Sequence, residues 1–135
     1  MDYDVFNGDA DGICALIQLR LAEPRTAELV TGVKRDVSLV KRIPDSDIGK
    51  VTVLDISFDK NRDEVRRVLP HASELFYCDH HYPGELIEDD KLDVLIKTDA
   101  NVCTSILVNG RLKGEFAAWA TVGAFGDNLA ASAEA

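Results

Sequence analysis

Short apolar segments alternate along the chain with longer amphipathic ones. The apolar segments are rich in β-branched residues and predict strands at residues 3–7, 27–33, 51–57, 74–79 and 92–98. The longer segments predict helices at residues 12–22, 36–43, 60–69 and 115–126. Strands that alternate with helices form βαβ units. We therefore expect an α/β fold, with a mainly parallel sheet and helices on both faces in a Rossmann-like three-layer arrangement.

Acidic residues and histidines collect where the predicted strands end. They are Asp9 and Asp11 after the first strand, Asp55 in the third, Asp79, His80 and His81 at the end of the fourth, and Asp127 after the last helix. The carboxyl ends of parallel strands meet at one edge of a sheet, where ligands bind. We therefore expect these side chains to converge.

Carboxylates packed this closely must be protonated or neutralised by a cation. A mixed set of carboxylates and imidazoles suits Mn²⁺, with Mg²⁺, Co²⁺ or Zn²⁺ as alternatives. Two such ions can activate water and bind both reacting oxygens in phosphoryl transfer, without a Cys or Ser nucleophile. Each segment also has an ordinary interpretation, because "GDADG" alone is typical of a turn with a helix N-cap and "DHH" alone of a surface loop. Their joint position at one sheet edge favours a site.

Composition narrows the possible partners. The chain has 135 residues, which is one domain by length, and a net charge of −9. That charge argues against a long nucleic-acid duplex, which needs a basic surface, but not against a small phosphoester or short oligonucleotide held by metal ions. No apolar run is long enough to cross a bilayer, the start "MDYD" is unlike a signal peptide, and the cysteines lack paired spacing. We expect a cytoplasmic protein without a membrane partner.

Taken in order, the motifs resemble the DHH phosphoesterase family. They are "NGDADG" at 7–12, "VTVLDIS" at 51–57, "CDHH" at 78–81 and "GAFGDN" at 123–128. The family includes RecJ-type exonucleases, oligoribonucleases, cyclic-dinucleotide phosphodiesterases and family II inorganic pyrophosphatases. The motifs span nearly the whole chain, and the ordered set is specific where any one motif is not.

The resemblance implies two bound divalent cations, with Mn²⁺ the favoured ion and Mg²⁺ or Co²⁺ as alternatives. Asp9 and Asp55 would hold the first ion, and Asp11, His80 and Asp127 would complete the second with Asp55 as a bridge. A metal-bridging hydroxide would be the nucleophile, so Asp55 and His80 count as catalytic residues.

The remaining implied roles concern the substrate and the support of the histidines. His81 would face the substrate phosphate as a third catalytic residue, and Asp79 would orient the histidine pair from behind. Two positions depart from the family pattern. Val5 stands where some relatives carry a histidine ligand, and Asn7 stands where exonuclease-type members have an aspartate. Asn7 can coordinate or hydrogen-bond but supplies no charge.

Family members usually continue into a second lobe that closes over the site. This sequence ends eight residues after Asp127. We therefore expect residues 1–135 to form the catalytic domain without the C-terminal substrate-binding lobe, and a surface left exposed there could support self-association.

Two alternatives remain open. One is an inactive or truncated DHH domain that binds metal without turnover. The other is a response-regulator receiver, an α/β domain of similar length, in which Asp55 would be phosphorylated and Lys97 would be its lysine. The receiver is less favoured because Asp9 and Asp11 are separated and because "CDHH" stands where receivers carry a hydroxyl residue.

Two further segments allow two interpretations each. The stretch "KRDVSLVKR" at residues 34–42 is the most basic, and a solvated helix face is favoured there over a phosphate guide. Thr104 and Ser105 could donate to a phosphate, but capping of a following helix is the first choice.

Overall fold

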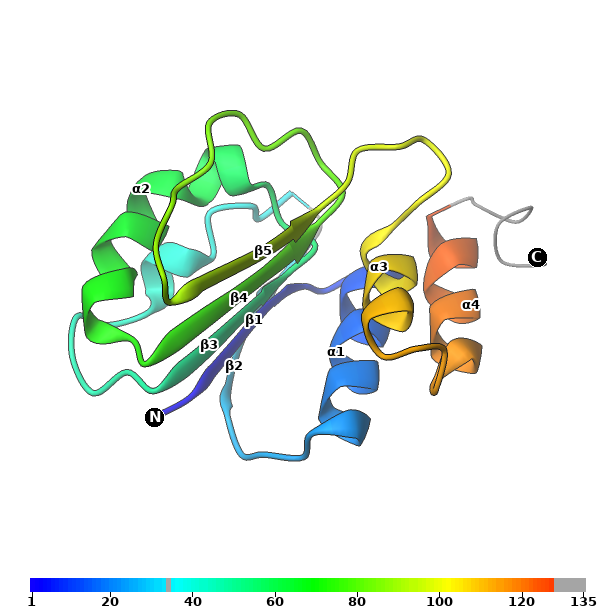
Figure 1. Ribbon diagram of the computed structural model, residues 1–135, viewed down its shortest axis with the longest axis horizontal. Coiled ribbons are helices and arrows are strands. Elements are labelled where there is room, and N and C mark those ends of the chain that lie inside the picture. Colours follow the sequence, from blue (N-terminus) through cyan, green and yellow to red (C-terminus); the bar gives the residue numbers. More distant parts are fainter. Residues whose placement is uncertain (34, 128–135) are drawn as a thin grey trace.

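The computed structural model describes residues 1–33 and 35–127. Within them, five strands form one sheet: β1 (Tyr3–Asn7), β2 (Glu28–Gly32), β3 (Lys50–Leu54), β4 (Glu74–Asp79) and β5 (Leu92–Ile96). The order across the sheet is β2-β1-β3-β4-β5, and every neighbouring pair is parallel (Figure 1). In this doubly wound order the chain changes direction between β1 and β3, the point at which such sheets bind ligands.

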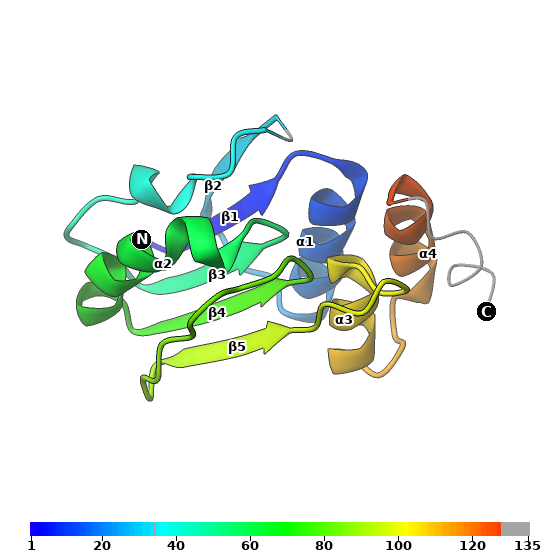
Figure 2. The same ribbon diagram turned by 90° about the horizontal axis from the view of Figure 1, so that it is seen from above.

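Helices cover both faces of the sheet (Figure 2). One face carries α1 (Ala10–Ala22) and α3 (Thr104–Arg111), and α4 (Ala117–Gly126) packs mainly on these two helices. The other face carries α2 (Phe58–Val68) and two short 3₁₀ turns, η1 (Val40–Arg42) and η2 (Leu69–His71). The predicted three-layer α/β fold is therefore confirmed.

Strand side chains alternate between two apolar cores. Val5 and Tyr77 pack in the core under α2 and η1, whereas Phe6 and Cys78 pack against α1 and α3. Because both faces are buried, the strand ends are fixed relative to one another. Val5 is fully buried in the first core, so the position at which some relatives have a histidine is a packing position here.

The helix predicted at residues 36–43 is wrong. Only η1 forms there, because Asn61 of α2 takes the backbone groups that a helix would use. Its Nδ2 donates to the Val37 carbonyl at 2.6 Å, and its Oδ1 accepts the Val40 N–H at 3.2 Å. Apart from η1 the segment is a loop, and its residues Leu39, Val40 and Ile43 are buried in the core beside α2.

None of the helices that the structure describes is long and apolar enough to cross a membrane.

Candidate metal centre

The loop after β1 combines a helix cap with a pair of carboxylates. Asp9 is the N-cap of α1, and its Oδ1 accepts the Gly12 N–H at 2.9 Å. Asn7 holds the turn by accepting the Asp9 N–H at 3.2 Å. A Cβ at Gly12 would lie 2.1 Å from the Asn7 carbonyl oxygen. Glycine is therefore needed at this position, because the first turn of α1 packs closely against the end of β1. The ordinary interpretation of "GDADG" is thus confirmed, and the same turn places Asp11 in the first turn of α1, fully buried.

Asp55 follows β3 with an unusual backbone conformation. Its φ is 62°, in the left-handed region, and its N–H donates to the Cys78 carbonyl at 3.0 Å. A non-glycine residue in this region costs on the order of 1–3 kcal/mol and is common at functional sites. The strand predicted to run to residue 57 therefore ends at Leu54, and Asp55 lies at the sheet edge beside β4.

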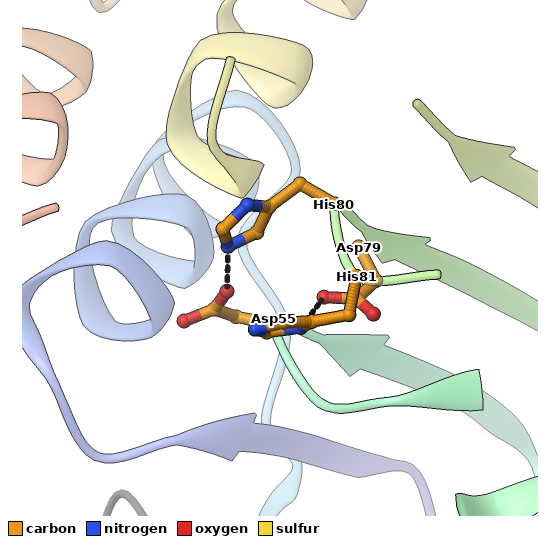
Figure 3. Close-up of side chains that lie close together, drawn as sticks. All are labelled: Asp55, Asp79, His80 and His81. Atoms are coloured by element: carbon orange, nitrogen blue, oxygen red, sulfur yellow. Dashed lines mark hydrogen bonds and ion pairs between the residues drawn. The ribbon is translucent and has the colours of Figure 1, made fainter. Parts of the chain in front are cut away.

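His80 brings three carboxylates from distant segments to one nitrogen. Its Nε2 lies 3.1 Å from Asp55 Oδ1, 3.3 Å from Asp127 Oδ2 and 3.6 Å from Asp11 Oδ2. Figure 3 shows the imidazole of His80 directed at Asp55. Donor atoms that share one ion at about 2.1 Å lie roughly 3.0–3.5 Å apart, so this spacing fits a metal site.

The electrostatics of the site call for a cation. Burial raises the pKa of Asp55 to about 11, and the nearby carboxylates of Asp11 and Asp9 contribute to this rise. Without a positive ion, Asp55 binds a proton instead. A divalent cation removes this repulsion, and the three carboxylates and one imidazole nitrogen are donors that Mn²⁺ accepts.

A second histidine is held by a buried acid. His81 Nδ1 lies 2.7 Å from Asp79 Oδ1 (Figure 3). This hydrogen bond outweighs the opposing effect of burial and leaves the pKa of His81 raised above its usual value. Asp79 is fully buried, and its Oδ2 has no hydrogen-bond partner among the described residues. The bond fixes the ring, so that His81 lines the cleft at the sheet edge.

Helix α3 supplies two site residues whose role the sequence did not reveal. The backbone N–H groups of Thr104 and Ser105 donate to the two carboxylate oxygens of Asp11, at 3.0 Å and 2.7 Å. The Thr104 hydroxyl donates to Asp55 Oδ1 at 3.1 Å, and the Ser105 hydroxyl donates to the Asp11 carbonyl at 2.7 Å.

The capping role expected of Thr104 and Ser105 is therefore wrong. Cys103 occupies the N-cap position and makes no side-chain capping bond. Asp11, from a distant segment, satisfies the first N–H groups of the helix. No local signal predicts this, because the hydrogen bonds join residues 93 and 94 positions apart.

Helix α4 approaches the centre closely because two of its residues are glycines. A Cβ at Gly123 would lie 2.3 Å from Ser105 Oγ, and one at Gly126 would lie 2.7 Å from Ala10 Cβ. This approach places Asp127, the C-cap of α4, beside His80. Asn128, the last residue of the "GAFGDN" motif, lies outside the described residues.

The ends of β1, β3 and β4 and the end of α4 line an open cleft of about 190 Å³. Its lining is formed by Asn7, Asp9, Asp55, His80, His81, Gly126 and Asp127. Asp11 and Asp79 are buried behind this surface. The structure thus brings all the residues predicted for the site to one edge of the sheet. Among the described residues, no ion pair joins Lys97 to Asp55, whose partners include His80 and Thr104, so the receiver alternative gains no support.

The solved structures that this fold matches include two RecJ exonucleases. An exonuclease RecJ bound to manganese matches 98% of this chain at 20% identity with a TM-score of 0.57, and the match covers 42% of that chain. RecJ in complex with Mn²⁺ from Thermus thermophilus matches 98% of this chain at 20% identity with a TM-score of 0.60, over 23% of its own chain. No protein-family model and no curated protein sequence matches. The likeness confirms the α/β fold, and this chain spans less than half the length of both RecJ chains.

Proposed function

We propose that this chain, which shares its fold with part of the RecJ exonucleases, is the catalytic domain of a metal-dependent phosphoesterase. The observation that carries the proposal is His80 Nε2, which lies within 3.6 Å of carboxylate oxygens of three aspartates from three separate segments. A structural ion pair needs one carboxylate for one histidine. Without a metal, three carboxylates around a partly buried imidazole repel one another and destabilise the fold. With a divalent metal, the same groups are a suitable set of ligands.

The residues divide into two metal positions. Asp11, Asp55, His80 and Asp127 would hold one ion, and Asp9 with Asp55 would begin the other, with Asn7 as a neutral neighbour. Divalent cations bound there would stabilise charge on phosphoryl oxygens and lower the pKa of a coordinated water. Mn²⁺ is the favoured ion, because both similar RecJ structures contain manganese.

In the proposed reaction the protein itself orients the Asp55 carboxylate and the His81 ring and supplies charge to the substrate phosphate. Thr104 donates to Asp55 Oδ1, which fixes the direction of that carboxylate. The hydrogen bond to Asp79 holds Nδ1 of His81 and raises the pKa of the ring, which favours the imidazolium form. In that form Nε2 carries a proton and would donate it in a hydrogen bond to a phosphate oxygen in the cleft. Asp79 therefore acts through His81 as a positioning residue.

We further propose a substrate that is a small phosphoester or a short single-stranded oligonucleotide. The net charge of −9 opposes a long duplex. Because the similar RecJ chains are more than twice as long as their matched parts, a further lobe is expected to contribute substrate contacts. The alternative of a metal-binding domain without turnover predicts the same ions and no hydrolysis.

The test measures hydrolysis of bis(p-nitrophenyl) phosphate and of a short oligonucleotide with Mn²⁺, and Mn²⁺ binding by calorimetry. His80→Ala should abolish hydrolysis and weaken Mn²⁺ binding. His71→Ala is the matched control, because His71 lies in η2 and is exposed. Mn²⁺ binding without turnover would support the inactive alternative. Absence of both in the wild type would refute the metal centre.

A further inference from the structure

The arginines of this acidic protein, and one lysine beside them in sequence, fall into two groups according to whether they form ion pairs with carboxylates. Those outside the loop between β2 and β3 all lie in ion pairs with carboxylates, namely Arg20, Arg25, Arg62, Arg66, Arg67 and Arg111. Within that loop, and among the residues that the structure describes, none of Arg35, Lys41 and Arg42 lies in such an ion pair. The loop therefore concentrates positive charge that no carboxylate neutralises directly.

The loop is attached to the same sheet edge as the metal centre. Gly32, at the end of β2, pairs in register with Asn7, which lines the metal cleft, and its carbonyl accepts the Gly8 N–H at 3.0 Å. Arg42 reaches back to this edge, where its Nη1 donates to the Thr31 carbonyl at 3.1 Å. Neighbouring strands lie about 4.8 Å apart, so the guanidinium is roughly two strand spacings, ~10 Å, from the cleft wall. Figures 1 and 2 show β2 leading into the loop at the carboxyl ends of the strands, from where the chain runs back to η1 on the face that carries α2.

The loop also encloses space for an anion. A second cavity, of about 220 Å³, is lined by Arg35, Lys41 and Arg42 together with Ser38, a hydroxyl donor. Asp36 is the acid in this lining. One of its carboxylate oxygens, Oδ2, is already engaged, because it accepts the Val33 N–H at 3.3 Å. Three cations against one carboxylate leave the cavity with net positive charge. The solvated helix face predicted for this stretch is therefore replaced by a cationic loop.

We infer that this cavity is an anion subsite for a phosphate of the substrate strand that lies more than one nucleotide away from the scissile phosphate. The inference rests on the proposed phosphoesterase function and specifies its substrate as a single-stranded oligonucleotide. The two phosphates of pyrophosphate share one oxygen and cannot reach both places, whereas two phosphates of a strand that are separated by more than one nucleotide can. In a protein that otherwise repels a polyanion, this loop directs the strand toward the cleft.

The test is a titration of the ¹⁵N-labelled chain with a phosphorothioate-linked thymidine tetranucleotide, with Mg²⁺ present. The amide signals of residues 35–42 should shift, and bis(p-nitrophenyl) phosphate, with its one phosphate, should shift them far less. In the double variant Arg35→Gln/Lys41→Gln, we expect the Kd to rise about fivefold per charge at low salt, as for an exposed ion pair. The slope of log affinity against log salt should become shallower by about 0.7 per lost phosphate contact. Lys113→Gln is the control, because Lys113 lies in the turn between α3 and α4 and lines neither cavity.

The outcomes separate this inference from the function on which it rests. Tetranucleotide shifts confined to the metal cleft, or equal affinity of wild type and double variant, would overturn the subsite. A wild type that binds the tetranucleotide at residues 35–42 but hydrolyses nothing with Mn²⁺ would retain the subsite and refute the phosphoesterase. If the wild type and the double variant hydrolyse the oligonucleotide at the same rate, the subsite is refuted and the phosphoesterase function is retained.

Discussion

Asp55→Asn should stabilise the metal-free protein near neutral pH, although it removes a proposed catalytic carboxylate. Asp55 is buried, and Asp11 and Asp9 add repulsion to the burial that raises its pKa to about 11. In the unfolded chain the same group has a pKa of about 3.9. The folded protein thus holds a proton that the unfolded chain releases. Its contribution to stability is full below about pH 4 and is lost as the pH rises toward 11.

The size of the effect follows from this difference. Each unit of pKa corresponds to about 1.4 kcal/mol. At about pH 7.5 the unfolded carboxyl, with a pKa of about 3.9, is ionised, so protonating Asp55 on folding destabilises the folded state by at most roughly 5 kcal/mol. Water in the cleft screens the carboxylates, and we expect roughly 2 kcal/mol. Asn keeps the shape of the side chain and can still accept the Thr104 hydroxyl. Asn also tolerates the left-handed backbone at φ 62° better than most residues.

The assay is urea unfolding in EDTA at about pH 4.5 and about pH 7.5. Asp55→Asn should be the more stable protein at the higher pH, and the difference should shrink at the lower pH. Asp4→Asn is the matched control, because Asp4 is equally buried but pairs with Arg20 at 2.9 Å. That substitution should destabilise by about 1.5–3 kcal/mol. A metal-free Asp55→Asn protein that is less stable than wild type at both pH values would refute the electrostatic reasoning.

Two further results are expected. Mn²⁺ should raise the melting temperature more at about pH 7.5 than at about pH 5, because protons compete with the ion for Asp55, whose pKa is raised. A shift in melting temperature that is independent of pH, measured by differential scanning fluorimetry, would contradict the assigned ligands. Gly123→Ala should destabilise by about 1–3 kcal/mol, because its Cβ would meet Ser105 Oγ at 2.3 Å. It should also weaken Mn²⁺ binding by moving Asp127, whereas Gly110→Ala, where a Cβ meets nothing within 4 Å, should leave Mn²⁺ binding unchanged.

The positions of the strands, though not all of their ends, were readable from the sequence, because the signals are local. Apolar runs such as "VTVLD" predict a strand wherever they lie, and acids directly after parallel strands must meet at one edge. The cap of α1 is equally local, since Asp9 and Gly12 are three residues apart. The segments of the proposed site could therefore be named before the fold was known.

The failures have a common cause in contacts between distant residues. The segment 36–43 carries an amphipathic pattern, yet Asn61 from α2 binds its backbone and replaces the helical hydrogen bonds. β3 ends at Leu54, where the backbone of Asp55 turns into the left-handed region and places its carboxylate beside His80. Neither feature leaves a mark in the neighbouring sequence.

The sequence by itself thus determined the α/β class, the residue types of the centre and the strands that these residues follow. The tertiary structure alone decided how those residues are used. It placed the Asp11 carboxylate on the N-terminus of α3, gave Asp55 a hydroxyl donor in Thr104, and brought Asp127 to His80 through the close packing of α4. The physical reason is that helix capping and ion pairing depend on distance in space, whereas propensity and periodicity act over a few residues of chain.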